Sequence, residues 1–179
     1  MSRSFLQAAG GLELRRLDPP DAEALQVIIE ADRDRLKRWM WWAERSTIDT
    51  TRAFIEAALT DDRLDPLGIV VEGELVGVIG ADADVITGNH AIGYWIGSAY
   101  EGQGYVTRAC FALLDHLFLV LGCHRVAIKA GTENARSRAI PERLGFVREG
   151  VERGGGRGSR GYHDLVVYSM LEDEWSPNA

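Results

Sequence analysis

The chain has 179 residues, which suits one domain of ordinary size, and its 46% hydrophobic residues can form a complete core. The formal net charge is −7, and this acidic balance argues against nonspecific nucleic-acid binding, which needs a basic surface. The sequence contains no run of ~18 apolar residues and no charged-then-apolar leader, so we expect a soluble cytoplasmic protein with no membrane partner.

The first third of the chain combines strand and helix patterns. Residues 1–10 are expected to form a loose N-terminal arm, and residues 12–17 alternate in the manner of a first strand. Two amphipathic helices are expected next, and Thr50 is predicted to cap the second one. Their inner faces are predicted to carry Ala22, Leu25, Ile29 and Leu36 on the first helix, and Phe54, Ile55, Ala58 and Leu59 on the second.

The middle of the chain is predicted to form three strands and a long helix. Apolar runs at 67–71 and 75–81 flank Glu72-Gly73-Glu74, which indicates a β-hairpin. A third strand covers residues 90–98 and leads into a glycine-containing turn. The apolar stripe of the helix that follows is made of Val106, Ala109, Cys110, Leu113, Leu114, Leu117, Phe118 and Leu121.

The rest of the chain contains a strand, a short helix and two more strands. The strand at 125–130 should join the one at 90–98 through a right-handed parallel crossover. The short helix covers residues 134–144, and the last two strands are expected at 146–153 and 162–171. The glycine-rich segment 154–161 between them cannot bury a core, so we expect a loop that is either a mobile flap or disordered.

Two cysteines, Cys110 and Cys123, cannot make a disulfide framework. The 13 residues between their positions correspond to ~20 Å along a helix, whereas a disulfide needs Cα atoms within ~7 Å. His124 follows Cys123, but no second ligand pair has the spacing of a metal site. We therefore expect two buried thiols and no bound metal.

The junction of strand and helix at residues 93–108 is the most informative segment. Gly102 and Gly104 allow a tight turn there, directly before the long helix. Such a junction points several backbone N–H groups at one spot, at the positive end of the helix dipole. The sequence therefore predicts a phosphate or pyrophosphate site that needs no charged side chain.

Five segments in this order carry a family resemblance. They are residues 92–96 (IGYWI), 102–107 (GQGYVT), 134–138 (NARSR), 142–150 (ERLGFVREG) and 162–168 (YHDLVVY). On these residues the chain resembles the GNAT superfamily of acetyl-CoA-dependent N-acetyltransferases, closest to its RimJ/RimL-type branch of ribosomal-protein N-terminal acetyltransferases. The resemblance implies one α/β (α+β) domain over residues 1–179. It also implies a mixed, mostly antiparallel sheet of about seven strands with helices on both faces.

The resemblance implies a binding mode for acetyl-CoA. Backbone amides of Gln103, Gly104, Tyr105, Val106 and Thr107 would hold the pyrophosphate, and Gly102 and Gly104 would let the chain approach it closely. The pantetheine arm would run along the strand containing Trp95 and Ile96, and the Ile96 N–H would polarise the thioester carbonyl. The alternative is that the glycines serve only a strand-to-helix turn.

Position 101 departs from the family pattern. Relatives have Gln or Arg there, whereas this chain has Glu101, whose carboxylate would be unfavourable beside a phosphate. We expect the Glu101 side chain to point to solvent, because the backbone amides alone would bind the pyrophosphate.

The resemblance also implies catalytic roles. Ser137 would protonate the leaving thiolate and Asn134 would hydrogen-bond the pantetheine, although both residue types also cap helices. Relatives carry a glutamate as general base in the loop before the last strand, and no carboxylate stands at the matching place near Gly156. The sequence neighbours Glu149, Glu152, His163 and Asp164 are the remaining candidates, and none is assigned.

The acceptor side is expected to be walled by Trp39, Trp42, Tyr94 and Asp164. Three indoles at positions 39, 41 and 42 cannot all face one core, so we expect at least one to be exposed. The basic run of Arg33, Arg35, Lys37 and Arg38 is expected to form a solvated face, with contacts to CoA or a peptide carboxylate as the alternative.

The acceptor is predicted to be the α-amine of a protein or peptide N-terminus, because without a dedicated base a low-pKa amine is favoured. A small-molecule amine such as an antibiotic or polyamine is one alternative. A non-catalytic acyl-CoA-binding module is another, and a homodimer is compatible with the exposed aromatic residues.

Overall fold

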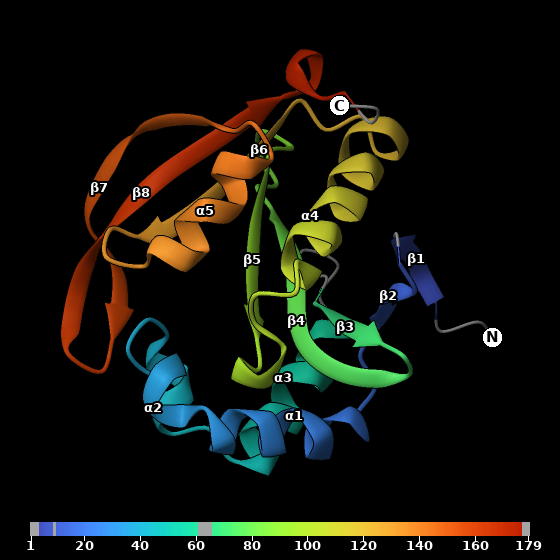
Figure 1. Cartoon of the computed structure of the whole chain (residues 1–179), viewed down its shortest axis with the longest axis vertical. Coiled ribbons are helices and arrows are strands. Elements are labelled where there is room, and N and C mark those ends of the chain that lie inside the picture. Colours follow the sequence, from blue (N-terminus) through green and yellow to red (C-terminus); the bar gives the residue numbers. More distant parts are fainter. Residues whose placement is uncertain (1–3, 9, 61–65, 177–179) are drawn as a thin grey trace.

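One sheet organises the structure, a computed structural model that describes residues 4–8, 10–60 and 66–176. Within these residues eight strands follow the order β1-β2-β3-β4-β5-β6-β8-β7 (Figure 1). The strands are β1 (Ser4–Ala8), β2 (Leu12–Arg16), β3 (Leu67–Val71), β4 (Glu74–Ala83), β5 (His90–Ile96), β6 (Arg125–Gly131), β7 (Val147–Gly158) and β8 (Gly161–Leu171). Neighbouring strands are antiparallel except β5 and β6, so the mixed, mostly antiparallel sheet is confirmed, with eight strands where about seven were predicted.

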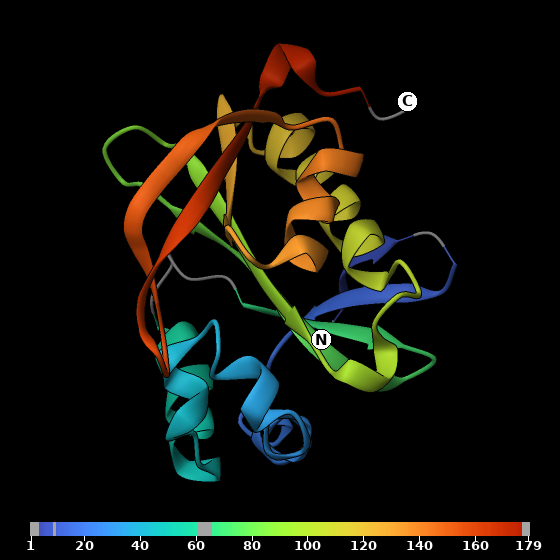
Figure 2. The same ribbon diagram turned by 60° about the vertical axis from the view of Figure 1, so that its left-hand side comes forward.

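Helices cover both faces of this sheet, as expected. They are α1 (Asp21–Ala31), α2 (Arg33–Leu36), α3 (Ile48–Ala58), α4 (Tyr105–Asp115) and α5 (Ala135–Arg143). Figure 2 shows α4 and α5 together on one side of the sheet, and α1, α2 and α3 gathered on the other. Single turns of 3-10 helix lie at Trp41–Glu44 (η1), Ser98–Tyr100 (η2) and Glu172–Glu174 (η4), and a π-helical segment lies at His116–Val120 (η3).

The long amphipathic helix connects the two parallel strands. Seven of its eight predicted stripe residues are buried, Val106 to Phe118, and they pack on the inner faces of β2 to β6. Leu121 is the exception, with 56% of its surface exposed. The helix changes from α to π geometry after Asp115, and this change turns the residues after Phe118 away from the stripe. Cys110 and Cys123 are free, buried thiols, as predicted.

The hairpin between β3 and β4 is confirmed in detail. Glu72 and Gly73 both have positive φ angles, 52° and 83°, and Val71 pairs directly with Glu74. Positive φ at both central residues belongs to the two-residue turn whose twist matches that of the flanking strands.

Three predictions for the N-terminal region are wrong. Residues 4–8 form strand β1, which pairs with β2. The edge of β2 supplies the backbone hydrogen-bond partners of this strand, and the sequence pattern of five residues does not show that such an edge is present. Thr47 caps α3, and Thr50 completes the reciprocal hydrogen bonds from the third helical position. On α3 only Ile55 of the four predicted inner residues is buried. Residues 1–3, 9 and 61–65 lie outside the described part of the chain.

The prediction that residues 154–161 form a mobile flap or a disordered loop is also wrong. β7 and β8 continue through this segment as a hairpin that turns at Ser159 and Arg160. Figure 2 shows the hairpin curving down toward the helices near the N-terminal end of the chain. The Ser159 amide donates to Lys37 O at 2.7 Å, and a Cβ at Gly158 would lie 2.0 Å from Arg38 O. Glycine is therefore required at position 158 by close packing of two backbones.

This contact predicts a stability difference between two glycine substitutions in β7. Gly158→Ala should lower the free energy of unfolding by about 1–3 kcal/mol, because the added methyl overpacks the contact with Arg38. Gly150→Ala is the matched control, since a Cβ there meets nothing within 4 Å, and it should stay within about 0.5 kcal/mol. Urea denaturation followed by circular dichroism measures both values. Equal losses in the two variants would contradict the packing of the hairpin tip.

Candidate functional site

The parallel strands β5 and β6 separate in the middle of the sheet. Their pairing covers only His90–Ile92 against residues 126–128, although β5 continues to Ile96 and β6 to Gly131. Beyond this point the facing backbone edge of β5 has no strand beside it.

The direction of the Ile96 amide follows from its pairing with β4. Gly97 N donates to Val76 O at 2.9 Å, so Ile96, which lies opposite Gly77, is in a non-hydrogen-bonded pair. Its N–H and C=O therefore point away from β4, into the gap. The carbonyl confirms this direction, because Ile96 O accepts from Arg35 Nη2 at 2.6 Å.

The turn between β5 and α4 presents further free amides. Gly102 and Gly104 have φ angles of 75° and 76°, which favour glycine. The first helical hydrogen bond runs from Arg108 N to Gly104 O at 3.0 Å, so the amides of residues 105–107 precede the helical ladder. The helix has no side-chain cap, and a Cβ at Gly102 or Gly104 would meet nothing within 4 Å. The space beside the turn is therefore open. Gly102 and Gly104 are required there by their positive φ angles and not by close packing within the protein.

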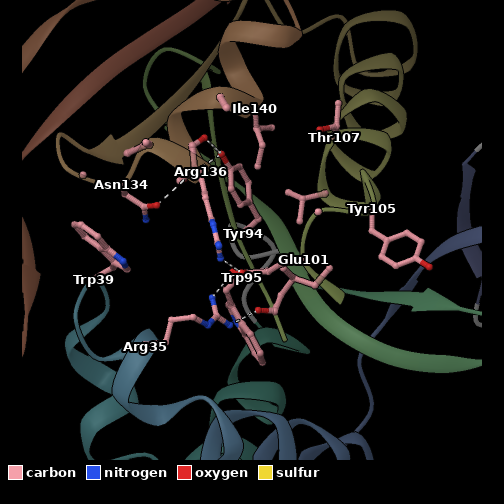
Figure 3. Close-up of a pocket in the computed structure, with 18 of the residues that line it drawn as sticks. Arg35, Trp39, Tyr94, Trp95, Glu101, Tyr105, Thr107, Asn134, Arg136 and Ile140 are labelled. Atoms are coloured by element: carbon pink, nitrogen blue, oxygen red, sulfur yellow. Dashed lines mark hydrogen bonds and ion pairs between the residues drawn. The ribbon is translucent and has the colours of Figure 1, made fainter. Parts of the chain in front are cut away.

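The gap and the turn belong to one cleft of about 1340 Å³. Figure 3 shows side chains from α2, β5, the glycine turn and α5 pointing toward one another, whereas the Tyr105 ring of α4 points away from them. Most of the predicted site residues line this cleft: Trp39, Tyr94, Trp95, Ile96, Gly102, Gln103, Gly104, Tyr105, Val106, Thr107, Asn134 and Ser137.

Two predicted acceptor residues do not line the cleft. Trp42 packs behind it against Trp95, with ring centroids 6.0 Å apart. Asp164 points to the other side of β8, where its Oδ1 accepts from Gly154 N at 2.8 Å and fixes the irregular part of the hairpin. Of the three clustered indoles Trp41 is 57% exposed, as expected for at least one of them.

Asn134 and Ser137 lie at the start of α5, beside Tyr94. Asn134 Oδ1 caps the helix by accepting from Ser137 N at 3.2 Å. The Tyr94 hydroxyl donates to Ser137 O at 2.9 Å and accepts from Ser137 Oγ at 3.3 Å (Figure 3). Burial raises the pKa of the Tyr94 hydroxyl far above its ordinary value, so this side chain remains protonated. The Ser137 hydroxyl is thus oriented by a neutral phenol inside the cleft.

The prediction that Glu101 points to solvent is wrong. Its side chain is 21% exposed, and its two oxygens pair with Arg35, at 2.8 Å, and with Arg136 (Figure 3). Arg35 also pairs with Asp32 at 2.7 Å. Two guanidinium groups therefore neutralise the carboxylate that stands at the family's Gln/Arg position, and they connect α2, the glycine turn and α5.

The basic run before the tryptophans is therefore more than a solvated face. Besides the Arg35 contacts, Arg33 donates to the carbonyls of Ala43 at 2.6 Å and Ser46 at 3.0 Å, which fixes the η1 segment. Sequence reasoning missed Arg136 as a cleft residue, and it named Arg35 only within the alternative that the basic run contacts CoA or a peptide carboxylate. The only signal for them was the carboxylate at position 101, which needs cationic partners if it is not exposed.

Comparison with known proteins agrees with this geometry. Residues 11–147 match the family described as "Acetyltransferase (GNAT) domain". This chain belongs to the GNAT acetyltransferase family. It is 39% identical over 170 residues to the protein described as "Putative ribosomal N-acetyltransferase YdaF" of Bacillus subtilis, covering 92% of this chain and 93% of that protein.

Two solved GNAT structures are similar over nearly the whole chain. Mycobacterium smegmatis RimJ, solved in complex with a CoA-disulfide, is 26% identical with a TM-score of 0.86, and the match covers 96% of this chain and 88% of that one. The microcin C7 self-immunity acetyltransferase MccE, solved with acetyl-CoA and AMP, is 25% identical with a TM-score of 0.89, covering 95% and 97%. These relatives bind CoA or acetyl-CoA.

The described part of the chain shows neither a cluster of metal ligands nor a membrane-spanning helix. In residues 4–8, 10–60 and 66–176, no group of three His, Cys, Asp or Glu side chains could hold a metal ion. None of the helices in the same ranges combines the length and apolar character needed to cross a membrane.

The ion pairs of Glu101 lead to a prediction about ligand affinity, with coenzyme A as the probe. Glu101→Gln removes the one carboxylate among the described residues that line the cleft, and it releases Arg136, whose side chain is 81% exposed. The dissociation constant for CoA should fall about threefold at low salt and change less at high salt, as measured by isothermal titration calorimetry. Glu172→Gln, which alters an exposed pair with His124, is the control. Weaker binding by Glu101→Gln would mean that Glu101 holds the two arginines for the ligand.

Proposed function

We propose that this protein is an acetyl-CoA-dependent N-acetyltransferase whose acceptor is the α-amine of a protein or peptide N-terminus. The observation that carries the proposal is the set of free amides at the start of α4, which opens onto the unpaired edge of β5. The acceptor would be a ribosomal or another newly made protein, and the enzyme would act on it in the cytoplasm.

The charges in the cleft fit a polyanionic ligand such as acetyl-CoA. Although the whole chain carries −7, the residues that line the cleft include five cationic side chains and one carboxylate. The cations are Arg35, Arg108, Lys129, Arg136 and Arg143, and the carboxylate is Glu101. The amides of residues 103–107 would add the positive end of the α4 dipole toward the diphosphate.

The gap between β5 and β6 suits an extended pantetheine arm. Trp95 lines the same stretch, and the Ile96 amide would donate to the acyl oxygen. Asn134 uses its Oδ1 for the helix cap, which leaves its amide N–H groups for the pantetheine. Acetyl-CoA supplies the acetyl group as a thioester, and Ser137 would give a proton to the departing thiolate sulfur.

Amine basicity favours an N-terminal acceptor. About a tenth of free α-amines are neutral at pH 7, since their pKa lies near 7.7–8.0. Only about one lysine amine in 2,500 is neutral at the same pH. Glu101, the only carboxylate among the described cleft-lining residues, is held in two ion pairs, so no free carboxylate in the cleft would take the proton of the more basic lysine amine.

A small-molecule amine is the second candidate. It is favoured by the similarity to MccE, whose structure contains AMP beside acetyl-CoA. The acceptor end of the present cleft is bounded by Trp39, Met40 and the β7–β8 hairpin, and an aromatic wall of this kind could contact either a peptide or a flat small molecule.

The decisive experiment offers acetyl-CoA with an array of N-terminal peptides and small amines, and follows released thiol. We expect turnover with unblocked peptides and none with the same peptides carrying a blocked N-terminus. Turnover confined to small amines would select the second candidate, and CoA binding without any turnover would indicate a non-catalytic module. Gly104→Val serves as the control for the site. It should lose CoA binding while circular dichroism shows a folded protein, because valine is strained at a φ of 76° and so distorts the turn locally, and its side chain would occupy the open space before the amides.

Ser137→Ala tests the proton donor. Turnover should fall about 10²-fold while the dissociation constant for CoA stays within about twofold, because the hydroxyl acts on the leaving group and not on the bound diphosphate. Tyr94→Phe is the companion variant, since it removes the partner of the Ser137 hydroxyl but leaves the serine. Unchanged turnover in Ser137→Ala would remove this residue from the mechanism.

A further inference from the structure

We propose that His163 is the general base that takes the proton of the acceptor amine. The proposal rests on the acetyltransferase function given above and supplies the base for which the sequence offers no carboxylate. His163 belongs to β8, and like Leu165 it lines the cleft, whereas Asp164 between them points to the opposite side.

The position of the imidazole is fixed by packing. Its ring meets the Trp39 indole edge to face, with centroids 5.7 Å apart and planes at 80°. A Cβ at Gly156 would lie 2.3 Å from His163 Nε2, and one at Gly131 would lie 3.5 Å from Cδ2. Two glycine backbones and one indole therefore hold the ring at the acceptor end of the cleft, and no side chain at 131 or 156 covers it.

The ring nitrogens are unused. Within residues 4–8, 10–60 and 66–176, the His163 side chain makes no hydrogen bond and no ion pair. The side chain is half-buried, and its ring nitrogens are not among the buried polar atoms that lack a partner, so they are accessible to solvent. In this position a nitrogen lone pair is available to a ligand in the cleft.

The charged groups around His163 are already partnered. Arg38, beside Trp39, pairs with Glu133 at 3.0 Å. Lys129 of β6 pairs with Glu152 of β7 at 2.6 Å. Asp164 accepts from Gly154, as described above.

The remaining acidic candidate is also occupied. Glu149 pairs with Arg125 at 2.7 Å and accepts from Ser169 at 2.9 Å, and this Arg125 pair holds the pKa of its carboxyl below the ordinary value. Of the four neighbours left open by the sequence, only His163 both faces the cleft and has free acceptor atoms.

The proton balance of the reaction is complete with this assignment. The amine nitrogen forms a bond to the acetyl carbon as the carbon–sulfur bond breaks. The proton lost by the nitrogen passes to His163, directly or through one water, and the sulfur takes the hydroxyl proton of Ser137. Ser137 then regains a proton from the protonated His163 through water in the cleft, so both residues return to their starting states. An imidazole is suited to this task, because it is the side chain that both accepts and releases protons near neutral pH.

The test compares His163→Phe and His163→Gln with His124→Gln, using whichever acceptor gives the highest turnover. Phenylalanine keeps the ring contact with Trp39 but accepts no proton, and glutamine keeps a polar atom but cannot be protonated at neutral pH. His124 is 66% exposed and pairs with Glu172, so it is a matched control. We expect both His163 variants to lose about 10²-fold in kcat/KM at pH 7 with an unchanged CoA dissociation constant. Their deficit should shrink above pH 8, where the amine is already neutral, and the pH profile should lose one ionisation.

Two results would overturn the proposal, and they separate it from the proposed function. If wild-type protein turns over an acceptor and His163→Phe matches it within about threefold from pH 6 to 9, His163 is not the base and the acetyltransferase function stands. If wild-type protein binds CoA but turns over no amine, both the function and the base assignment fail.

Discussion

The separation of β5 from β6 is the constraint on which the rest of the site depends. Two parallel strands must be joined by a crossover, and here the crossover helix α4 starts directly after β5. The same end of β5 therefore has free strand amides on one edge and the free amides of a helix start just beyond it. If β6 stayed paired with β5 to its end, the strand amides would be consumed by the ladder, and the helix start would face a closed sheet. Because the strands part after residues 92 and 128, one break in the ladder creates both halves of a binding cleft.

Side-chain charge in this cleft is arranged to assist the backbone. Glu101 would repel an anion, yet it stands between Arg35 and Arg136, and Arg35 is itself anchored by Asp32 and by Ile96 O. This network attaches α2 to the end of β5, so the helix that precedes Trp39 and the strand that carries the Ile96 amide are connected directly. A Gln at position 101, as in the family pattern, could not neutralise two arginines at once. The departure at one position is thus compensated by cations from two distant segments.

The sequence predicted correctly the elements that have strong local periodicity. It did not predict the structure of segments that depend on a partner distant in the chain. The stripe of α4, the β3–β4 turn and the glycine turn each depend on residues within one segment, and all three are confirmed. β1 was missed because its partner β2 determines it, and Thr50 was preferred to Thr47 because both occur within one capping sequence. The cleft residues known from the resemblance could be named, but the ion pairs of Arg35 and Arg136 with Glu101 could not, since nothing in the spacing of these three residues shows that they meet.

Glycine has two different structural roles in this chain, and the amino-acid composition does not distinguish them. Gly102 and Gly104 have positive φ angles and empty space around the missing side chain, so they serve a backbone conformation. Gly131, Gly156 and Gly158 have another group where a Cβ would be: Trp39, His163 and Arg38 O, respectively. The second set is therefore a packing surface, which explains why a segment so rich in glycine forms an ordered hairpin. Because glycine leaves these positions without side chains, Trp39 packs against Gly131 and His163 packs against Gly156, and the two rings meet edge to face at one end of the cleft. A segment that looks in sequence like a flexible linker thereby helps to place an aromatic wall and an imidazole there.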